Sequence, residues 1–148
     1  MDDLYNKLTL NVLLIEDNPA DVRMIQEVLK EFKTKTKIYA VHNGFEALKF
    51  LNKKGKYENN ADIDLILLDL NIPLINGFEV LKEIRANDKL KDTLVFVLTT
   101  SNNQENFLKA YELQANCFMV KPLYFDEYEI LLQHIEKCWL KVKPSSNI

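Results

Sequence analysis

Residues 65–69 read Leu-Ile-Leu-Leu-Asp, four consecutive apolar residues that end on an acid. An apolar run of this length, without polar alternation, is typical of a strand covered on both faces, as in a parallel sheet. Similar runs occur at 12–15, 94–98 and 117–120, and a weaker one lies at 37–41. The pattern therefore predicts five strands.

The segments between these runs have helical spacing. The first helix is expected to begin at Asn18-Pro19, an N-cap residue followed by proline at the first helical position. Further helices are expected at about 44–51, from about 77, from about 103 and at about 126–140. Five strand–helix alternations predict an α/β fold: a doubly wound parallel sheet with right-handed crossovers and helices on both faces.

Composition limits the class of protein. The chain has 148 residues, of which 47% are hydrophobic and 28% charged. These values are expected for one ordinary domain that needs no metal or disulfide to stabilise its core. A net charge of -3 argues against a general nucleic-acid binder, so we expect no direct nucleic-acid partner. The sequence has neither an apolar run of membrane-spanning length nor signal-peptide features, so we expect no membrane contact and a cytoplasmic location.

The sequence indicates one domain over 1–148, with a core at about 10–140 and flexible ends at 1–8 and 143–148. The polar stretch 52–61 is interpreted as a surface excursion. Because no second domain is visible, we expect any output to come through partner binding.

The two cysteines and two histidines show no metal-site spacing. Cys117 and Cys138 fall in a predicted strand and helix, and we expect both to be buried or half-buried free thiols. His42 and His134 are isolated and are expected to be solvated or partly packed.

Three acids directly follow two of the apolar runs. Glu16 and Asp17 follow the first strand, and Asp69 follows the third. Ligands of open parallel sheets bind at the carboxyl ends of the strands, where we expect these acids to meet. Such a cluster repels itself unless a hard divalent cation neutralises it, and oxygen ligands suit Mg²⁺. Helix capping or solvation could explain each acid alone, but not the set.

Two further polar residues end strands at the same edge: Thr99 ends the fourth run, and Lys121 follows the fifth. A hydroxyl and an ammonium group facing a metal-bound carboxylate are suited to holding a phosphoryl group. The pattern therefore predicts phosphoryl transfer to Asp69 as nucleophile, catalysed mainly by positioning and electrostatics.

The sequence resembles the receiver domain of bacterial response regulators over about residues 10–140. Intervals of 30 residues from Asp69 to Thr99 and 22 from Thr99 to Lys121 are similar to those of the chemotaxis receiver. Four motifs carry the resemblance: Ile-Glu-Asp-Asn at 15–18, Leu-Leu-Asp-Leu-Asn-Ile-Pro at 67–73 with Gly77, Leu-Thr-Thr-Ser at 98–101 and Phe-Met-Val-Lys-Pro at 118–122.

This resemblance implies a flavodoxin-like (βα)5 fold with strand order 2-1-3-4-5. It implies that Asp69 accepts a phosphoryl group from the phosphohistidine of a sensor histidine kinase, forming aspartyl phosphate, and that the chain is a signalling phosphoacceptor rather than an enzyme. It further implies Mg²⁺ bound by Glu16 or Asp17, by Asp69 and by the main-chain carbonyl of Asn71. A cis Lys121–Pro122 peptide bond is also implied.

Within receivers, the segments 16–21, 55–57, 98–101 and 115–118 resemble the small regulators that serve bacteriophytochrome-type kinases. The family switch implies that Thr99 and Phe118 reorient on phosphorylation and change the surface of the fourth helix, fifth strand and fifth helix. Two positions depart from the common pattern. Phe118 stands where tyrosine is frequent, and Thr100 stands where alanine or glycine is frequent.

The last predicted helix carries a wide apolar arc. It is interpreted as a homodimer surface, as the resemblance to phytochrome-associated regulators also implies, although a broad core stripe explains the pattern too. The arc consists of Tyr124, Phe125, Tyr128, Leu131, Leu132, Ile135, Cys138 and Trp139.

Other functions fit the sequence less well. A haloacid-dehalogenase-type phosphatase needs a second acid two residues after its nucleophile, where this chain has Asn71. The sequence also lacks the glycine-rich motifs that are typical of nucleotide-binding proteins. A phosphorylation-independent pseudo-receiver, acting as an interaction module, stays open as the alternative.

Overall fold

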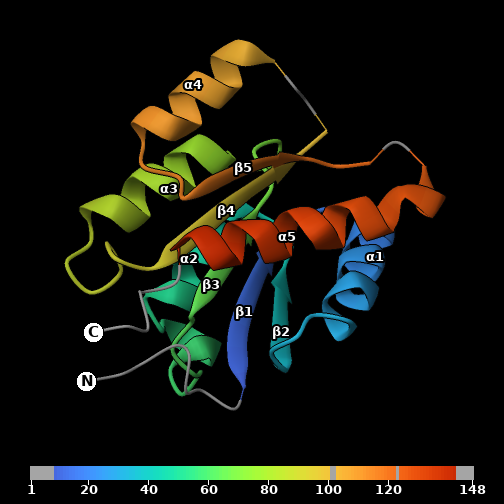
Figure 1. Cartoon of the computed structure of the whole chain (residues 1–148). Coiled ribbons are helices and arrows are strands. Elements are labelled where there is room, and N and C mark those ends of the chain that lie inside the picture. The colour runs from blue at the N-terminus through green and yellow to red at the C-terminus, as the bar shows by residue number, and fades with distance from the viewer. Residues whose placement is uncertain (1–8, 101–102, 123, 143–148) are drawn as a thin grey trace, which may run out of the picture.

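The computed structural model describes residues 9–100, 103–122 and 124–142. Its centre is a parallel five-stranded sheet in the order β2-β1-β3-β4-β5 (Figure 1), which confirms the predicted flavodoxin-like fold. Sequence order reverses between β1 and β3, so ligand-binding side chains are expected beyond the carboxyl ends of these strands. The strands are β1 (Leu10–Ile15), β2 (Thr36–Val41), β3 (Leu65–Leu68), β4 (Leu94–Thr99) and β5 (Cys117–Val120).

Five α-helices alternate with the strands. They are α1 (Pro19–Lys30), α2 (Gly44–Leu51), α3 (Gly77–Ala86), α4 (Gln104–Glu112) and α5 (Tyr128–Val142). None of the helices in the described parts of the chain is long and apolar enough to cross a membrane.

Asparagine side chains cap the first four helices. Asn18, Asn43, Asn76 and Asn103 each accept hydrogen bonds from main-chain N–H groups of the following first turn. These bonds satisfy donors that have no partner inside the helix. The last helix begins later than predicted, because the 3₁₀ turn Phe125–Glu127 precedes it.

The sheet separates two apolar layers, because successive side chains of a strand point to opposite faces. In β1, Val12 and Leu14 pack with α1 and α5, whereas Leu13 and Ile15 pack with α2 and α3. Figure 1 shows α1 and α5 together on one face of the sheet. The two layers hold the strand ends in a fixed arrangement.

Gly77 permits a close approach that shapes the loop after β3. A Cβ atom at this position would lie 2.6 Å from the carbonyl oxygen of Asp69 and 2.5 Å from the Cα of Leu70. Both contacts are shorter than real Cβ contacts, and both involve main chain. Glycine therefore lets the start of α3 pack directly on the segment that carries Asp69.

The prediction of two free thiols is wrong. Cys117 and Cys138 form a disulfide, with their Cα atoms 6.2 Å apart. Their separation of 21 residues carries no pairing signal, but β5 and α5 pack against one another and bring the two side chains together. Only tertiary packing creates the pair.

The expected cis bond is also absent. No peptide bond within 9–100, 103–122 and 124–142 is cis, so Lys121–Pro122 is trans. The trans isomer is intrinsically favoured for an X–Pro bond by about 0.5–1 kcal/mol. Lys121 reaches its partners with the bond in this form.

The predicted surface excursion forms a short 3₁₀ turn, Gly55–Tyr57. Tyr57 fastens it to α2, because its ring packs 5.1 Å from that of Phe50 and its hydroxyl donates to Glu46 at 3.2 Å. The segment is thus an ordered cover on α2, on the side of the sheet away from α1 and α5.

Candidate acidic site at the carboxyl edge of the sheet

Two neighbouring strands bring the three predicted acids together. Ile15 and Leu68 are register partners in β1 and β3, so the residues that follow them emerge side by side. Carboxylate oxygens of Glu16, Asp17 and Asp69 lie within 4.8 Å of one another. Glu16 and Asp69 are only 1% and 6% exposed, whereas Asp17 is exposed.

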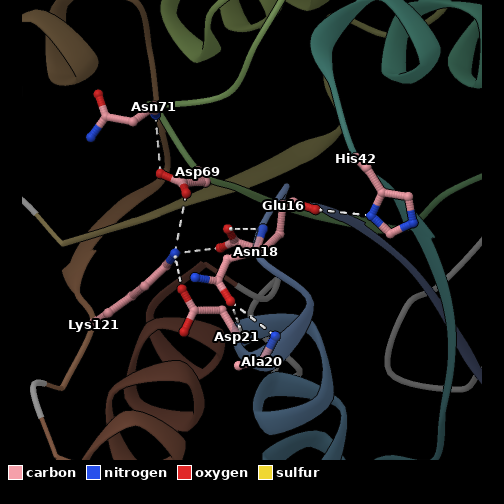
Figure 2. Close-up of polar contacts among 8 residues, drawn as sticks. All are labelled: Glu16, Asn18, Ala20, Asp21, His42, Asp69, Asn71 and Lys121. Carbon is pink, nitrogen blue, oxygen red and sulfur yellow. Dashed lines mark hydrogen bonds and ion pairs between the residues drawn. The ribbon is translucent and has the colours of Figure 1, made fainter.

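Lys121 enters this acidic cluster from the edge strand β5. Its Nζ donates to Asp69 Oδ2 at 3.1 Å and to Asp21 Oδ2 at 2.9 Å, and it also forms an ion pair with Glu16 Oε1. Figure 2 shows these three carboxylates around one ammonium group. Since the lysine side chain is 6% exposed, the cation neutralises part of a largely buried negative charge.

Asp21 is a site residue that the sequence reasoning missed. It lies in the first turn of α1, where an acid is expected to serve the helix N-terminus. Its carboxylate instead meets Lys121, 100 residues away in the sequence. No local spacing signals this contact, which depends on how α1 lies beside the end of β5.

The charges in the site shift one another's pKa values. Burial raises the pKa of Glu16 to about 7; the contact with Lys121 opposes this shift and the negative charge of Asp69 adds to it. Burial by itself lowers the pKa of Lys121, but its contacts with Glu16 and Asp21 and the charge of Asp69 outweigh it and raise that pKa. Lys121 therefore stays charged at neutral pH, whereas the pKa of Glu16 lies near 7.

The donor set fits a divalent cation. The Oε1 atom of Glu16 is buried and receives no hydrogen bond of acceptable geometry, although it pairs electrostatically with Lys121. Together with Asp17 and Asp69 it presents hard carboxylate oxygens, the ligands that Mg²⁺, Mn²⁺ and Ca²⁺ share. The main-chain N–H of Asn71 donates to Asp69 Oδ1 at 3.1 Å and so orients that carboxylate.

Thr99, the last residue of β4, is fully buried at the same sheet edge. Its main-chain oxygen accepts from the N–H of Lys121 at 2.7 Å, which joins the two predicted site residues through the backbone. Thr100, the next residue, is exposed. The Thr99 side chain is therefore carried by the last residue of a strand at this end of the sheet.

Phe118 lies on β5, two positions before the partner of Thr99. The register pairs Val97 with Phe118 and Thr99 with Val120, so Thr99 and Phe118 belong to the same face of the sheet. The half-buried Phe118 ring meets Phe107 of α4 edge to face, with centroids 5.4 Å apart. Its ring therefore faces α4.

One histidine touches the site indirectly. Nδ1 of the exposed His42 lies 3.1 Å from the main-chain oxygen of Glu16. The contact positions backbone and adds no carboxylate ligand. His134 is exposed on α5.

The apolar arc of the last helix is largely consumed by the protein's own core. Leu131, Ile135, Cys138 and Trp139 are buried, and Tyr128 and Leu132 pack against the same layer. The side chain of Phe125 lies outside what the structure describes. Large apolar residues exposed near this helix are Val120, Tyr124, Ile130 and Leu140.

Comparisons with known proteins agree with this geometry. The response regulator Rcp1 of Synechocystis is 42% identical over 130 residues, covering 88% of each chain, and its Mn²⁺-bound structure superposes with a TM-score of 0.83 at 40% identity, covering 92% and 99%. The phosphorylated cyanobacterial phytochrome response regulator RcpA gives 0.85 at 38% identity, covering 92% and 97%. The bacteriophytochrome response regulator AtBRR gives 0.70 at 34%, covering 85% and 91%.

The family described as the response regulator receiver domain matches residues 12–134, a span that contains every acid of the site as well as Thr99, Phe118 and Lys121. Relatives of the chain include a metal-bound and a phosphorylated protein of the same fold. On the sequence match, the fold and the acidic cluster together, the chain belongs to the response regulator receiver domains of two-component signalling systems.

Proposed function

We propose that Asp69 accepts a phosphoryl group from the phosphohistidine of a sensor histidine kinase and that Mg²⁺ assists the transfer. The observation that carries this proposal is the contact of Lys121 Nζ with Asp69 Oδ2 at 3.1 Å inside a cluster of three carboxylates. One lysine would be enough to neutralise a single buried carboxylate. Several acids around one ammonium group leave negative charge that a divalent cation can neutralise, and the lysine can then also contact a phosphoryl group on Asp69.

In the proposed reaction, a carboxylate oxygen of Asp69 attacks phosphorus, the P–N bond to histidine breaks, and an acyl phosphate forms. Asp69 is 6% exposed and lies past the end of β3, so the donor approaches from beyond the sheet edge. The main-chain N–H of Asn71 holds one oxygen of Asp69 in place. Lys121 supplies a fixed positive charge beside the other oxygen, where charge develops.

Glu16, Asp17 and Asp69, with the main-chain carbonyl of Asn71, would hold the cation. Its chemistry would be neutralisation of negative charge on the acids and on the transferred group. Buried Glu16, whose pKa is near 7, has to be ionised to act as a ligand. Mn²⁺ in the Rcp1 structure supports a divalent metal in this kind of protein.

Thr99 and Phe118 would carry the signal away from Asp69. The added charge of about -1.5 to -2 attracts the Thr99 hydroxyl, and the space that it leaves lets Phe118 turn inward. Phe118 packs on Phe107 of α4, so this turn would change the surface formed by α4, β5 and α5. Loss of the Phe107–Phe118 contact in a phosphoryl-mimic complex is the expected structural sign.

We propose a bacteriophytochrome-type kinase as the partner and the cytoplasm as the location. Relatives described as phytochrome and bacteriophytochrome response regulators support this partner class. A purified bacteriophytochrome kinase carrying radiolabelled phosphohistidine should transfer the label to the wild-type chain and not to Asp69→Asn. Transfer only from kinases of other classes would exclude this partner.

Intact-mass spectrometry after incubation with acetyl phosphate tests the central proposal. The wild type should gain one phosphoryl group in the presence of Mg²⁺ and none when the metal is chelated, and Asp69→Asn should gain none. Asp88→Asn is the matched control, because Asp88 is exposed on the loop after α3, away from the acidic cluster. It should behave as wild type.

The pseudo-receiver is the alternative that this experiment decides. In that case the acidic cluster and Lys121 form a permanent structural network, and partners bind the unmodified chain. No adduct under conditions that trap short-lived aspartyl phosphate would favour it. The next measurement would then be kinase binding by the unphosphorylated protein.

We further propose a homodimer formed by the exposed apolar residues of α5 and its neighbours. The candidates surround the end of β5 and the outer side of α5. Sedimentation should show concentration-dependent association, weakened by Ile130→Glu. A concentration-independent monomer, both with and without phosphorylation, would contradict this surface. The residues are Val120, Tyr124, Ile130 and Leu140.

A further inference from the structure

The Cys117–Cys138 disulfide joins two elements that the fold already packs together. Cys117 is the first residue of the edge strand β5, and Cys138 lies in the second half of α5. Cys138 is 8% exposed, within the apolar layer of α1 and α5, and half-buried Cys117 packs against that layer. Because the packing of β5 and α5 places the two sulfur atoms together, each cysteine should stay next to the other when the bond is reduced.

One of the two cysteines borders a surface groove. Cys117 lines a groove of about 240 Å³ between α4 and β5, together with the rings of Phe107 and Tyr111 and the side chain of Lys141. The lysine adds positive charge to this groove, which suits the approach of an anionic disulfide such as glutathione disulfide. Cys138 lines no part of the groove. The arrangement is therefore asymmetric, because Cys117 borders the groove whereas the buried Cys138 is sheltered from it.

We propose that Cys117 and Cys138 form a reversible thiol–disulfide modification site that reacts with small disulfides such as glutathione disulfide. The thiolate of Cys117 attacks one sulfur of glutathione disulfide and releases one glutathione thiolate. The Cys138 thiolate then attacks the mixed disulfide at the Cys117 sulfur and releases the second. Two protein thiols are oxidised, one glutathione disulfide is reduced to two thiols, and two protons pass to the released thiolates or to solvent.

The disulfide links the strand next to the acidic cluster, β5, to the last helix, α5. β5 carries Phe118 and Lys121 follows it, and α5 lies beside it on the α1 side. Oxidation closes a loop of 21 residues across the β5–α5 connection. When reduced, β5 would keep its ladder with β4 and its packing but would lose the covalent link to α5. Any influence of this restraint on the response of Phe118 and Lys121 to phosphorylation rests on the proposed function above, whereas the thiol chemistry does not.

The experiment equilibrates the full chain in glutathione buffers, quenches with acid, labels free thiols with N-ethylmaleimide and measures intact mass. As glutathione disulfide increases, the chain should change from two N-ethylmaleimide labels to none without a singly labelled form. On a non-reducing denaturing gel it should run as a single chain. The oxidised form should melt on the order of 10 °C higher than the reduced form. Hydrogen exchange in β5 and the second half of α5 should be slower when oxidised.

Single-cysteine variants test the asymmetry. Cys138→Ala lacks the resolving thiol and should accumulate a glutathione adduct on Cys117, whereas Cys117→Ser should accumulate several-fold less on sheltered Cys138. Asp69→Asn should show the same thiol chemistry as wild type, which separates this inference from the phosphoryl chemistry.

Three results would each overturn the proposal. Two labels that persist at high glutathione disulfide would mean that the pair does not oxidise. A bond that reduced glutathione cannot open in the folded chain would make it a permanent structural staple. Oxidation that yields mainly disulfide-linked dimers would mean that the two cysteines react between molecules.

Discussion

Two cations join distant segments of this receiver domain, and they do so with opposite kinds of partner. Lys121 meets three carboxylates at the carboxyl edge of the sheet. Arg85, at the end of α3, donates to main-chain oxygens of Lys91, Thr93 and Gln114 at 2.7–3.0 Å and to the side-chain oxygen of Asn116. Every one of these acceptors of Arg85 is neutral, and every one of those partners of Lys121 is acidic.

The pKa shifts follow the same division. Burial lowers the pKa of Arg85, with only the charge of Asp92 opposing it. Bonds to carboxylates raise the pKa of Lys121 in spite of burial. Neutral acceptors lock one geometry between α3 and the loops around it. Carboxylates leave a network whose charges a metal or a phosphoryl group can redistribute, so only the lysine junction suits a switch.

The largest effect is expected from Lys121→Met. Removing the ammonium leaves buried Glu16 and Asp69 without their cation, and breaking such a pair typically costs about 3–5 kcal/mol of unfolding free energy. Phosphoryl uptake from acetyl phosphate should slow by about 10²–10³-fold. Urea unfolding and intact-mass kinetics measure the two effects.

Lys82→Met is the control for this variant, because Lys82 is exposed on α3. If Lys121→Met lowers stability no more than the control, the buried carboxylates do not depend on the lysine. Lys121→Arg, which keeps the charge, provides a folded variant for kinetics if methionine prevents folding.

Glu16→Gln should change how stability depends on pH. In the folded chain Glu16 has a pKa of about 7, compared with an ordinary value of 4.5. Between these values the folded protein holds a proton that the unfolded chain has released, so unfolding free energy falls as pH rises and the loss is complete above about 7. The glutamine variant lacks this loss.

In metal-free buffer the variant and wild type should therefore be equally stable below pH 4.5 and diverge up to pH 7, the variant becoming more stable by at most about 3 kcal/mol. Urea unfolding across this range measures the difference. Added Mg²⁺ should reverse the order above pH 7, because it stabilises the ionised carboxylate. Parallel pH profiles for the two proteins would rule out the raised pKa.

Arg85→Ala should reduce stability without changing the chemistry. It removes hydrogen bonds that tie α3 to the turns before β4 and β5, which costs about 1–3 kcal/mol. The rate of phosphoryl uptake should stay within about twofold of wild type, because distant sites act independently. Arg23→Ala, an exposed position on α1, is the control. A large effect on the rate would show that the contacts of Arg85 and those of Lys121 are coupled.

The smallest effect is expected from Asp21→Asn. In the proposed function Asp21 would compete with the phosphoryl group for Lys121, and asparagine keeps the shape of the side chain but removes its charge. A change of about 0.5–1 kcal/mol in this competition should lengthen the aspartyl phosphate lifetime about two- to fivefold. Phosphate loss followed by mass spectrometry measures it, with Glu27→Gln on the same helix as control. A shortened lifetime would contradict the competition.

Local patterns predicted most of the fold correctly. The runs at 65–68 and 117–120 have the bounds of β3 and β5, because strands covered on both faces need unbroken apolar sequence. Asn18 and Pro19 located the start of α1, since capping is decided by the first turn alone. The start of α5 was placed two residues early, because a 3₁₀ turn has nearly the same side-chain spacing.

The sequence by itself determined the order of strands and helices and which polar residues end the strands. Parallel strands share one carboxyl edge, so Glu16, Asp17, Asp69 and Lys121 had to emerge together. Tertiary structure alone decided that Asp21 completes the lysine's partners and that Cys117 bonds to Cys138. Both contacts depend on how a helix lies across the sheet, and residue spacing within the helix does not specify that placement.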